Sequence, residues 1–203
     1  MRLRHLLPAL RRLVALSVVA GAAALLTACS APPWAGSPTP TTTPPTSPPA
    51  AVANDLAAGS MTRTIEVGAI TLTIDYWSTL PMDEWTAAEN KPLSFAVHAA
   101  VTPADGQRIY LSRVTATPVV AGPDGPLPSF PAIVDQASVS PGYLVLDPYS
   151  YSQTFIVPAL DPGADRLELT MTYELLQQST PTSTDYAKQT AVDTVTIAIA
   201  PEH

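Results

Sequence analysis

The sequence predicts an all-β fold, an antiparallel β-sandwich of about seven or eight strands, preceded by a signal peptide and a disordered Pro/Thr-rich linker. In several segments after residue 60, apolar residues recur at every second position, as in strands that bury one face. No long segment has the 3.6-residue apolar spacing of a helix. Turn-forming Gly and Pro residues separate the alternating segments, and residues 60–203 are enough for one domain.

The strands are expected in a definite order along the chain. A turn at Gly68-Ala69 separates the first two strands, and a turn at 103–106 ends the third. In the fourth strand the alternation becomes irregular after Leu111, which indicates a β-bulge. A Pro/Gly-rich excursion, 122–141, then leads to shorter strands. The expected strands, in order, are 65–67, 70–76, 95–101, 108–120, 143–146, 153–157, 167–175 and 195–199.

One stretch near the C-terminus has the pattern of a corner between two sheets. A strand precedes the segment 158–163, which contains Leu160-Asp161-Pro162-Gly163, and a second strand follows it. The stretch resembles the E–F corner of immunoglobulin-like and fibronectin-III-like domains. Arg166 stands where the fibronectin family has its corner tyrosine, so the resemblance implies a generic immunoglobulin-like sandwich in which this turn crosses between sheets.

The first 28 residues have the layout of a secretory signal peptide. Four arginines up to Arg12 form a positive segment, and an apolar run, 13–26, follows it. The run is shorter than the ~20 apolar residues of a comfortable membrane span. Residues 1–28 are therefore expected to be removed on export.

The residues that end this segment are Leu26, Thr27, Ala28 and Cys29. They resemble the lipobox of bacterial lipoproteins. The resemblance implies cleavage before Cys29, a diacylglycerol on its thiol, and a location on the extracytoplasmic face of the cell membrane. Two acyl chains are enough for stable anchoring. The alternatives are an ordinary signal peptide with a chance cysteine, or an uncleaved membrane helix.

Between the anchor and the domain, 29–59 is expected to be a linker. Its first part, 30–50, is almost entirely Pro, Thr, Ser and Ala, a composition that forms extended spacers. Cys29 is the only cysteine, which excludes disulfides and, once acylated, cysteine chemistry. Removing the four arginines leaves six basic against seventeen acidic residues, a net charge of −11 that disfavours nucleic acid as a partner.

Residues that carry chemistry are sparse, so no catalysis, cofactor or metal is expected. The chain has no Gly-x-Ser-x-Gly, His-Glu-x-x-His or phosphate-binding glycine loop. His98 lies on the face of its strand opposite Phe95, among Ser94, Ala96 and Ala100, where a histidine at the sheet surface is the simplest interpretation. Asp83, Glu84 and Glu89 surround Trp85, where a solvated acidic loop is the simplest interpretation. The alternative is an envelope hydrolase that uses Asp83 and Glu84, or His98.

A long aromatic connection offers the best candidate binding residues, which are Tyr76, Trp77, Asp83, Glu84 and Trp85. Loops of this length are often functional, and clustered Trp and Tyr favour recognition. We therefore expect a tethered binding module for an envelope protein or cell-wall polymer, in which a second aromatic loop, 148–151, joins the first. The competing interpretation is that Trp77 ends its strand in the core and Trp85 plugs one end of the sandwich.

Overall fold

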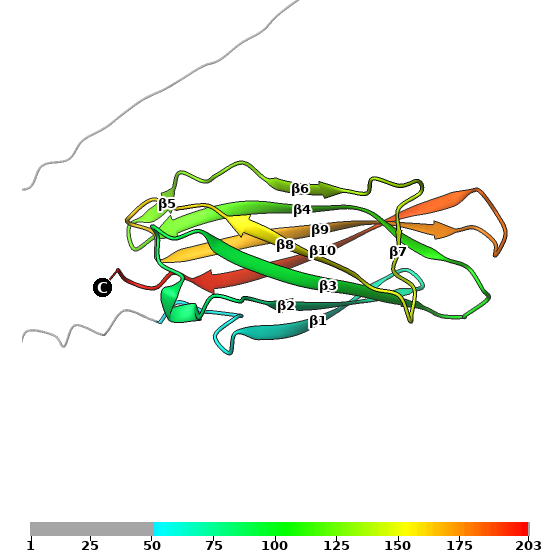
Figure 1. Cartoon of the computed structure of the whole chain (residues 1–203), viewed down its shortest axis with the longest axis horizontal. Coiled ribbons are helices and arrows are strands. Elements are labelled where there is room, and N and C mark those ends of the chain that lie inside the picture. Colours follow the sequence, from blue (N-terminus) through cyan, green and yellow to red (C-terminus); the bar gives the residue numbers. More distant parts are fainter. Residues whose placement is uncertain (1–50, 203) are drawn as a thin grey trace, which may run out of the picture. The chain divides into compact units, whose positions relative to one another are not determined.

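The computed structural model describes residues 51–202, which form two antiparallel β-sheets packed as a sandwich (Figure 1). The first sheet has the order β1-β2-β3-β8 and the second β10-β9-β4-β5, with β6 and β7 also paired to β4. The elements are β1 (Ser60–Val67), β2 (Ile70–Trp77), the 3₁₀ turn η1 (Met82–Glu84), β3 (Lys91–Val101), β4 (Ile109–Gly122), β5 (Gly125–Leu127), β6 (Ile133–Gln136), β7 (Tyr143–Leu144), β8 (Tyr151–Val157), β9 (Arg166–Gln178) and β10 (Tyr186–Ala198).

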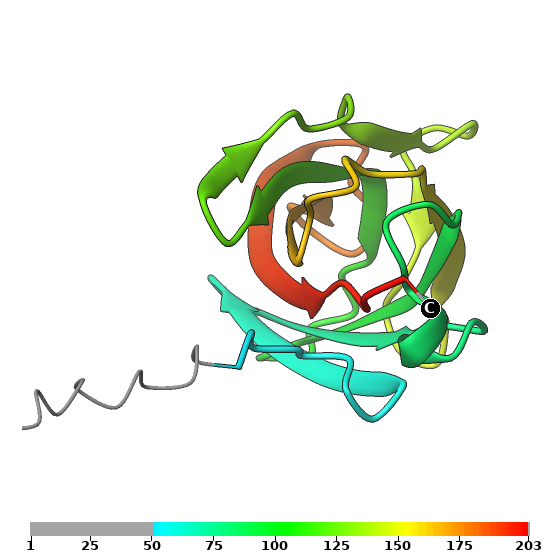
Figure 2. The ribbon, with the colours of Figure 1, turned by 90° about the vertical axis from the view of Figure 1, so that its left-hand side faces the viewer.

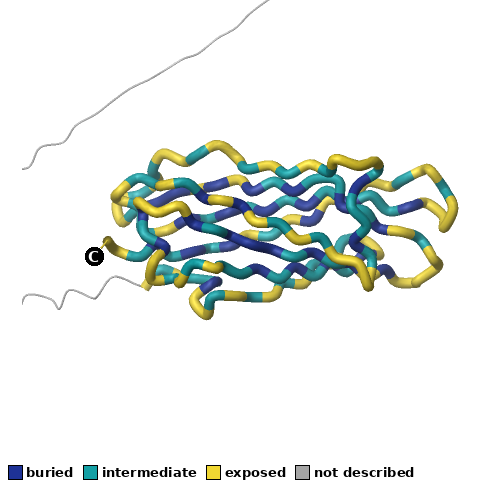
Figure 3. Tube along the Cα trace, viewed as in Figure 1, coloured by how far each residue is buried: buried dark blue, intermediate teal, exposed yellow. Residues whose placement is uncertain are grey.

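The core lies between the two sheets, and the end view in Figure 2 shows strands on all sides of it. Buried and half-buried residues alternate along β2 and most of β9, as the sequence pattern predicts. Figure 3 shows this alternation along the long strands, with exposed residues gathered in the connecting loops. Phe95 of β3 packs edge-on against Phe155 of the same sheet, with ring centroids 5.1 Å apart. It also packs edge-on against Tyr173 of the second sheet, with ring centroids 6.2 Å apart. Apolar burial between the sheets therefore stabilises the fold.

The described residues contain about ten strands, so the expected seven or eight is too low. The excursion at 122–141 contains β5 and β6, which were not expected. Neither strand contains a buried residue, and both are held by backbone pairing with β4. Such pairing leaves no alternation of apolar residues in the sequence. For the same reason β10 begins at Tyr186 rather than near 195: its polar first half pairs with β9 throughout.

The bulge expected in β4 is confirmed. The pairing of β4 with β9 shifts between Leu111 and Arg113. Ser112 lies at the shift, and its hydroxyl donates to the main-chain oxygen of Glu174 at 3.0 Å. The hydroxyl of the bulged residue thus bonds to β9, the strand whose pairing with β4 the bulge interrupts.

The segment 158–165 carries the chain from β8 in the first sheet to β9 in the second, as the corner pattern predicts. The Asp161 carboxylate accepts a hydrogen bond from the amide of Gly163 at 2.9 Å, an Asx turn. A Cβ on Gly122 would collide with the main-chain oxygen of Gly163. Glycine at position 122 therefore lets the corner approach the end of β4 closely.

The packed chain begins before Ser60, earlier than the domain boundary expected from composition. Leu56 is fully buried in the core. The Asp55 amide donates to the main-chain oxygen of Thr196, and the Asp55 carboxylate accepts from the Thr196 amide, both at 2.8 Å. Arg63 forms a 3.0 Å salt bridge with Asp55. The predicted signal peptide, the lipobox Leu26, Thr27, Ala28 and Cys29, and the linker up to residue 50 lie outside the described residues.

Candidate functional site

The two aromatic loops lie at opposite ends of the sandwich, so the expectation that they join is wrong. The segment 78–90 precedes Lys91 at the start of β3, the end at which the described chain begins and ends (Figure 1). In the pairing of β3 with β8, Lys91 lies opposite Val157, whereas Val97 lies opposite Tyr151. The loop before Tyr151 is therefore directed toward the other end, because antiparallel strands run in opposite directions.

Trp85 is fully buried at the end where the chain enters. Its indole nitrogen donates to the hydroxyl of Ser78 at 2.9 Å, which satisfies the buried N–H. The same hydroxyl accepts from the amide of Leu80 at 3.1 Å, and the amide of Ala200 donates to the main-chain oxygen of Trp85 at 3.0 Å. Trp85 thus plugs this end of the sandwich, as the competing interpretation states.

Tyr76 is also buried and points between the sheets. Its hydroxyl lies 2.9 Å from the hydroxyl of Tyr173 and donates to Asp193 Oδ2 at 3.0 Å. Burial raises the pKa of Tyr76 far above its ordinary value, and the neighbouring Tyr173 is the next largest cause of this rise. Tyr76 therefore links the two sheets, and it is not accessible to a partner on the surface.

Three predicted residues remain accessible. Trp77 is half-buried at the end of β2, and Asp83 and Glu84 are exposed in η1. Asp83 and Glu84 line a hollow of about 690 Å³, which we name the acidic hollow. It is lined by Leu80, Asp83, Glu84, Thr86, Ala88, Glu89 and Glu202.

Glu202 is the lining carboxylate that sequence reasoning missed. The chain reaches this end because Thr86 forms a parallel β-bridge with Ala200. No local pattern signals a contact over such a separation, so only the fold brings the Glu202 side chain to the hollow that Glu84 also lines. Four carboxylates around one open hollow favour cations and repel anionic surfaces.

Lys91 lies behind this hollow and is fully buried. Its ammonium group donates to the main-chain oxygens of Thr86 at 2.9 Å, of Ala87 at 3.4 Å and of Glu89 at 2.5 Å. Burial lowers the pKa of Lys91 to about 8, and the nearby Glu89 carboxylate opposes that shift. Lys91 therefore orders the segment 86–90, a role that sequence reasoning also missed.

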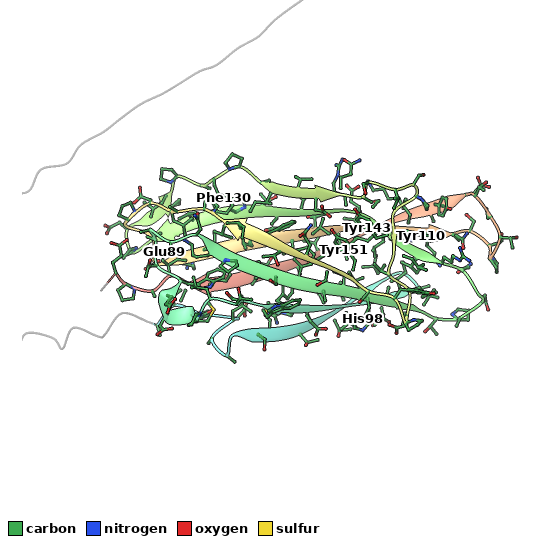
Figure 4. All side chains as sticks on the ribbon, in the orientation of Figure 1. Glu89, His98, Tyr110, Phe130, Tyr143 and Tyr151 are labelled. Carbon is green, nitrogen blue, oxygen red and sulfur yellow. The ribbon has the colours of Figure 1, made fainter. Side chains whose placement is uncertain are left out.

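His98 and the acidic loop are not brought together. His98 is half-buried in β3, opposite Thr73 of β2, and Figure 4 shows it well away from Glu89. Within residues 51–202, no group of three or more His, Cys, Asp or Glu side chains has an arrangement that could hold a metal ion. In the same part of the chain, no helix has the length and hydropathy needed to cross a membrane. Comparison with models of known protein families and with curated protein sequences finds no match for this chain.

Proposed function

We propose that this protein is a non-catalytic binding module of the bacterial cell envelope, anchored to the extracytoplasmic face of the membrane by a diacylglycerol on Cys29. The observation that carries the proposal is the run Leu26-Thr27-Ala28-Cys29, which directly follows a basic and apolar segment. The Pro/Thr-rich linker after it suits a spacer between lipid and domain. The sandwich that follows contains its own core, as a tethered module requires.

We also propose that the sandwich is immunoglobulin-like. The order β2-β3-β8 in one sheet and β10-β9-β4-β5 in the other supports this assignment, since two Greek-key sheets of this kind pack face to face in such domains. The crossing from β8 to β9 at the corner 158–165 supports it further. β1 then extends the first sheet by one strand through its hairpin with β2.

The position of the chain entry favours binding at the far end. The Asp55 contact with Thr196 holds the entering chain against the last strand, at the end that also carries the acidic hollow. A tether attached there leaves the β9–β10 hairpin and the β3–β4 loop farthest from the attachment point, and the β7–β8 loop lies toward the same end (Figure 1). These loops are the best placed to meet an envelope partner.

The anchor is tested with Cys29→Ser, and Ser30→Ala serves as the matched control. The sulfur is the proposed attachment point for the lipid, so Cys29→Ser is expected to lose labelling by radioactive palmitate and to leave the detergent phase in phase separation. Ser30→Ala is expected to behave as the wild type does. A Cys29→Ser protein that still carries label and still partitions into detergent would exclude the proposed anchor.

Binding is tested by chemical crosslinking in intact cells, followed by recovery of the protein and identification of what is attached. We expect an envelope component to be recovered with the wild type. Recovery of the protein alone, at several crosslinker lengths, would contradict a binding role even if the anchor holds.

A further inference from the structure

A second hollow lies at the end of the sandwich opposite the chain entry. We name it the Tyr149 hollow; its volume is about 530 Å³, and it is lined by Gly106, Arg108, Leu144, Leu146, Asp147 and Tyr149. A neighbouring hollow of about 290 Å³ shares Gly106, Leu146 and Asp147 with it. The lining comes from the β3–β4 loop, from β7 and from the β7–β8 loop. Such convergence of separate segments on one concave surface is typical of a small-molecule site.

The backbone beneath Asp147 and Tyr149 is fixed to both sheets. The Val145 amide donates to the Ile109 oxygen at 3.0 Å, and the Val145 oxygen accepts from the Ala99 amide at 2.7 Å. The Asp147 amide donates to the Ala99 oxygen at 2.9 Å. The Tyr149 amide donates to the main-chain oxygen of Leu146, another residue that lines the hollow, at 3.0 Å. A ligand therefore meets a loop that is already ordered, which lowers the entropic cost of binding.

Arg108 is held in the same way, although its side chain is exposed. Its amide donates to Gln178 Oε1 and its main-chain oxygen accepts from the Gln178 amide, both at 3.0 Å, and Gln178 is buried. Neighbouring tyrosines, Tyr110 first and then Tyr149 and Tyr186, raise the pKa of the Arg108 guanidinium above its ordinary value.

Four tyrosines at this end of the sandwich brace one another in pairs. The Tyr110 and Tyr186 rings pack edge to face with centroids 5.9 Å apart. Tyr143 and Tyr151 stack at 4.5 Å, and the Tyr151 hydroxyl donates to Asp135 Oδ2 at 2.6 Å. Figure 4 shows Tyr110, Tyr143 and Tyr151 gathered near β7. Tyr149 differs from them, because it is 58% exposed and is the only aromatic residue among the exposed large hydrophobic residues of the described chain.

We propose that the Tyr149 hollow binds a neutral saccharide unit of a cell-envelope polysaccharide, an inference that rests on the proposed function. The exposed ring of Tyr149 offers an apolar face to the C–H face of a sugar. Arg108 supplies hydrogen-bond donors and Asp147 supplies acceptors for sugar hydroxyls, which both donate and accept.

The charges in the hollow favour a neutral ligand over an ion. Asp147 and the expected net charge of −11 repel a free anion, whereas Arg108 repels a free cation. A protein partner is disfavoured because the other exposed large hydrophobic residues are aliphatic and lie on other segments. These are Val119, Val134, Val139, Ile156 and Val192. One exposed ring suits a small ligand better than a protein interface, whose core gathers several such side chains.

The test uses the full-length protein in polyoxyethylene detergent, which carries no sugar that would compete. Three neutral probes, arabinohexaose, mannohexaose and fully N-acetylated chitohexaose, are titrated separately by isothermal calorimetry. At least one probe is expected to bind, with Tyr149→Ala weakening it about tenfold or more, as for a central aromatic anchor. Tyr149→Phe keeps the ring and is expected to bind as the wild type does within about threefold. Arg108→Gln is expected to weaken binding, and Ile156→Ala, an exposed change on β8, is the control that leaves it unchanged.

Two results would overturn the inference. One is that no probe binds; the other is that Tyr149→Ala binds as tightly as the wild type while its melting temperature is unchanged. Crosslinked capture of a protein that Tyr149→Ala abolishes, with no probe bound, would assign the hollow to a protein instead. In each case palmitate labelling at Cys29 and capture of an envelope component decide the proposed function separately.

Discussion

The hydroxyl oxygens of Tyr76 and Tyr173 lie 2.9 Å apart inside the sandwich, although Tyr76 belongs to β2 of one sheet and Tyr173 to β9 of the other. Because the Tyr76 hydroxyl donates to Asp193 Oδ2, the Tyr173 hydroxyl donates to Tyr76. Both buried hydroxyls are therefore satisfied, and the chain of hydrogen bonds ends at a carboxylate on β10. This polar link joins three strands of the two sheets in one geometry.

Tyr76→Phe is expected to destabilise the domain by about 1–3 kcal/mol, because it leaves the Tyr173 hydroxyl without its acceptor and Asp193 Oδ2 without its donor. The free energy of unfolding in urea is the measurement. Tyr149→Phe removes an exposed hydroxyl and serves as the control, with an expected change within about 0.5 kcal/mol. Equal stability of the two variants would show that the buried link contributes nothing.

The same buried pair predicts a loss of stability at high pH. Burial raises the pKa of both Tyr76 and Tyr173 above the ordinary value of 10.0, so above that pH the unfolded chain loses protons that the folded chain keeps. The free energy of unfolding is therefore expected to fall as the pH rises beyond 10.0, and to fall less steeply in Tyr76→Phe. Parallel pH profiles for the two proteins would contradict this expectation.

The buried Lys91 is expected to make the free energy of unfolding change with pH in the opposite direction, and at lower pH. Its pKa in the folded chain is about 8, below the ordinary 10.5, so the unfolded chain binds more protons between these values. The free energy of unfolding is expected to rise with pH from about 8 toward 10 in the wild type relative to Lys91→Met, which cannot titrate. Chemical unfolding of both proteins at half-unit pH steps checks this, and a constant difference between them would refute it.

Trp85→Ala is expected to destabilise the domain by about 3–5 kcal/mol, because it removes a fully buried ring and leaves a cavity. Trp77→Ala, at a half-buried position, is the matched control and is expected to cost less. Thermal melting and crosslinked capture are measured on both variants. If Trp85→Ala melts as the wild type does but fails in capture, Trp85 acts in recognition and its burial is not maintained in solution.

The start of the domain is tested by comparing chains that begin at Ala51 and at Ser60. The shorter chain lacks Leu56 and the Asp55 contacts, and is expected to be less stable by about 2–5 kcal/mol, the cost of emptying a buried leucine site. Both chains are expected to give β-type circular dichroism. Equal urea midpoints would place Leu56 outside the cooperative core.

The prediction from sequence succeeded where the signal is local and failed where it is not. The strand at 70–76 and the bulge after Leu111 were predicted because alternation and its interruption are visible within a few residues. β5 and β6 were missed because backbone pairing with β4 holds them, and such pairing leaves no pattern in the side chains.

The candidate binding residues show the same division. Asp83 and Glu84 are exposed as acidic loop residues usually are, but Tyr76 and Trp85 are buried. An aromatic residue in a loop suits either a core or a recognition surface, and composition alone does not distinguish them. The folded chain places Trp85 and Tyr76 in the core, where the Trp85 indole bonds to the Ser78 hydroxyl and the Tyr76 hydroxyl to that of Tyr173. The Tyr76–Tyr173 contact joins residues far apart in the sequence, so no local pattern reveals it.

By itself, the sequence determined the all-β class, because a period of two is a property of the local chain and specifies which face of each strand is apolar. Only the tertiary structure decided which strands pair, that Leu56 enters the core, that Lys91 lies behind the acidic hollow, and that the two aromatic loops lie at opposite ends. The physical reason is that these features depend on burial and hydrogen bonds between segments far apart in the chain, which become favourable only when the two sheets close over a common core.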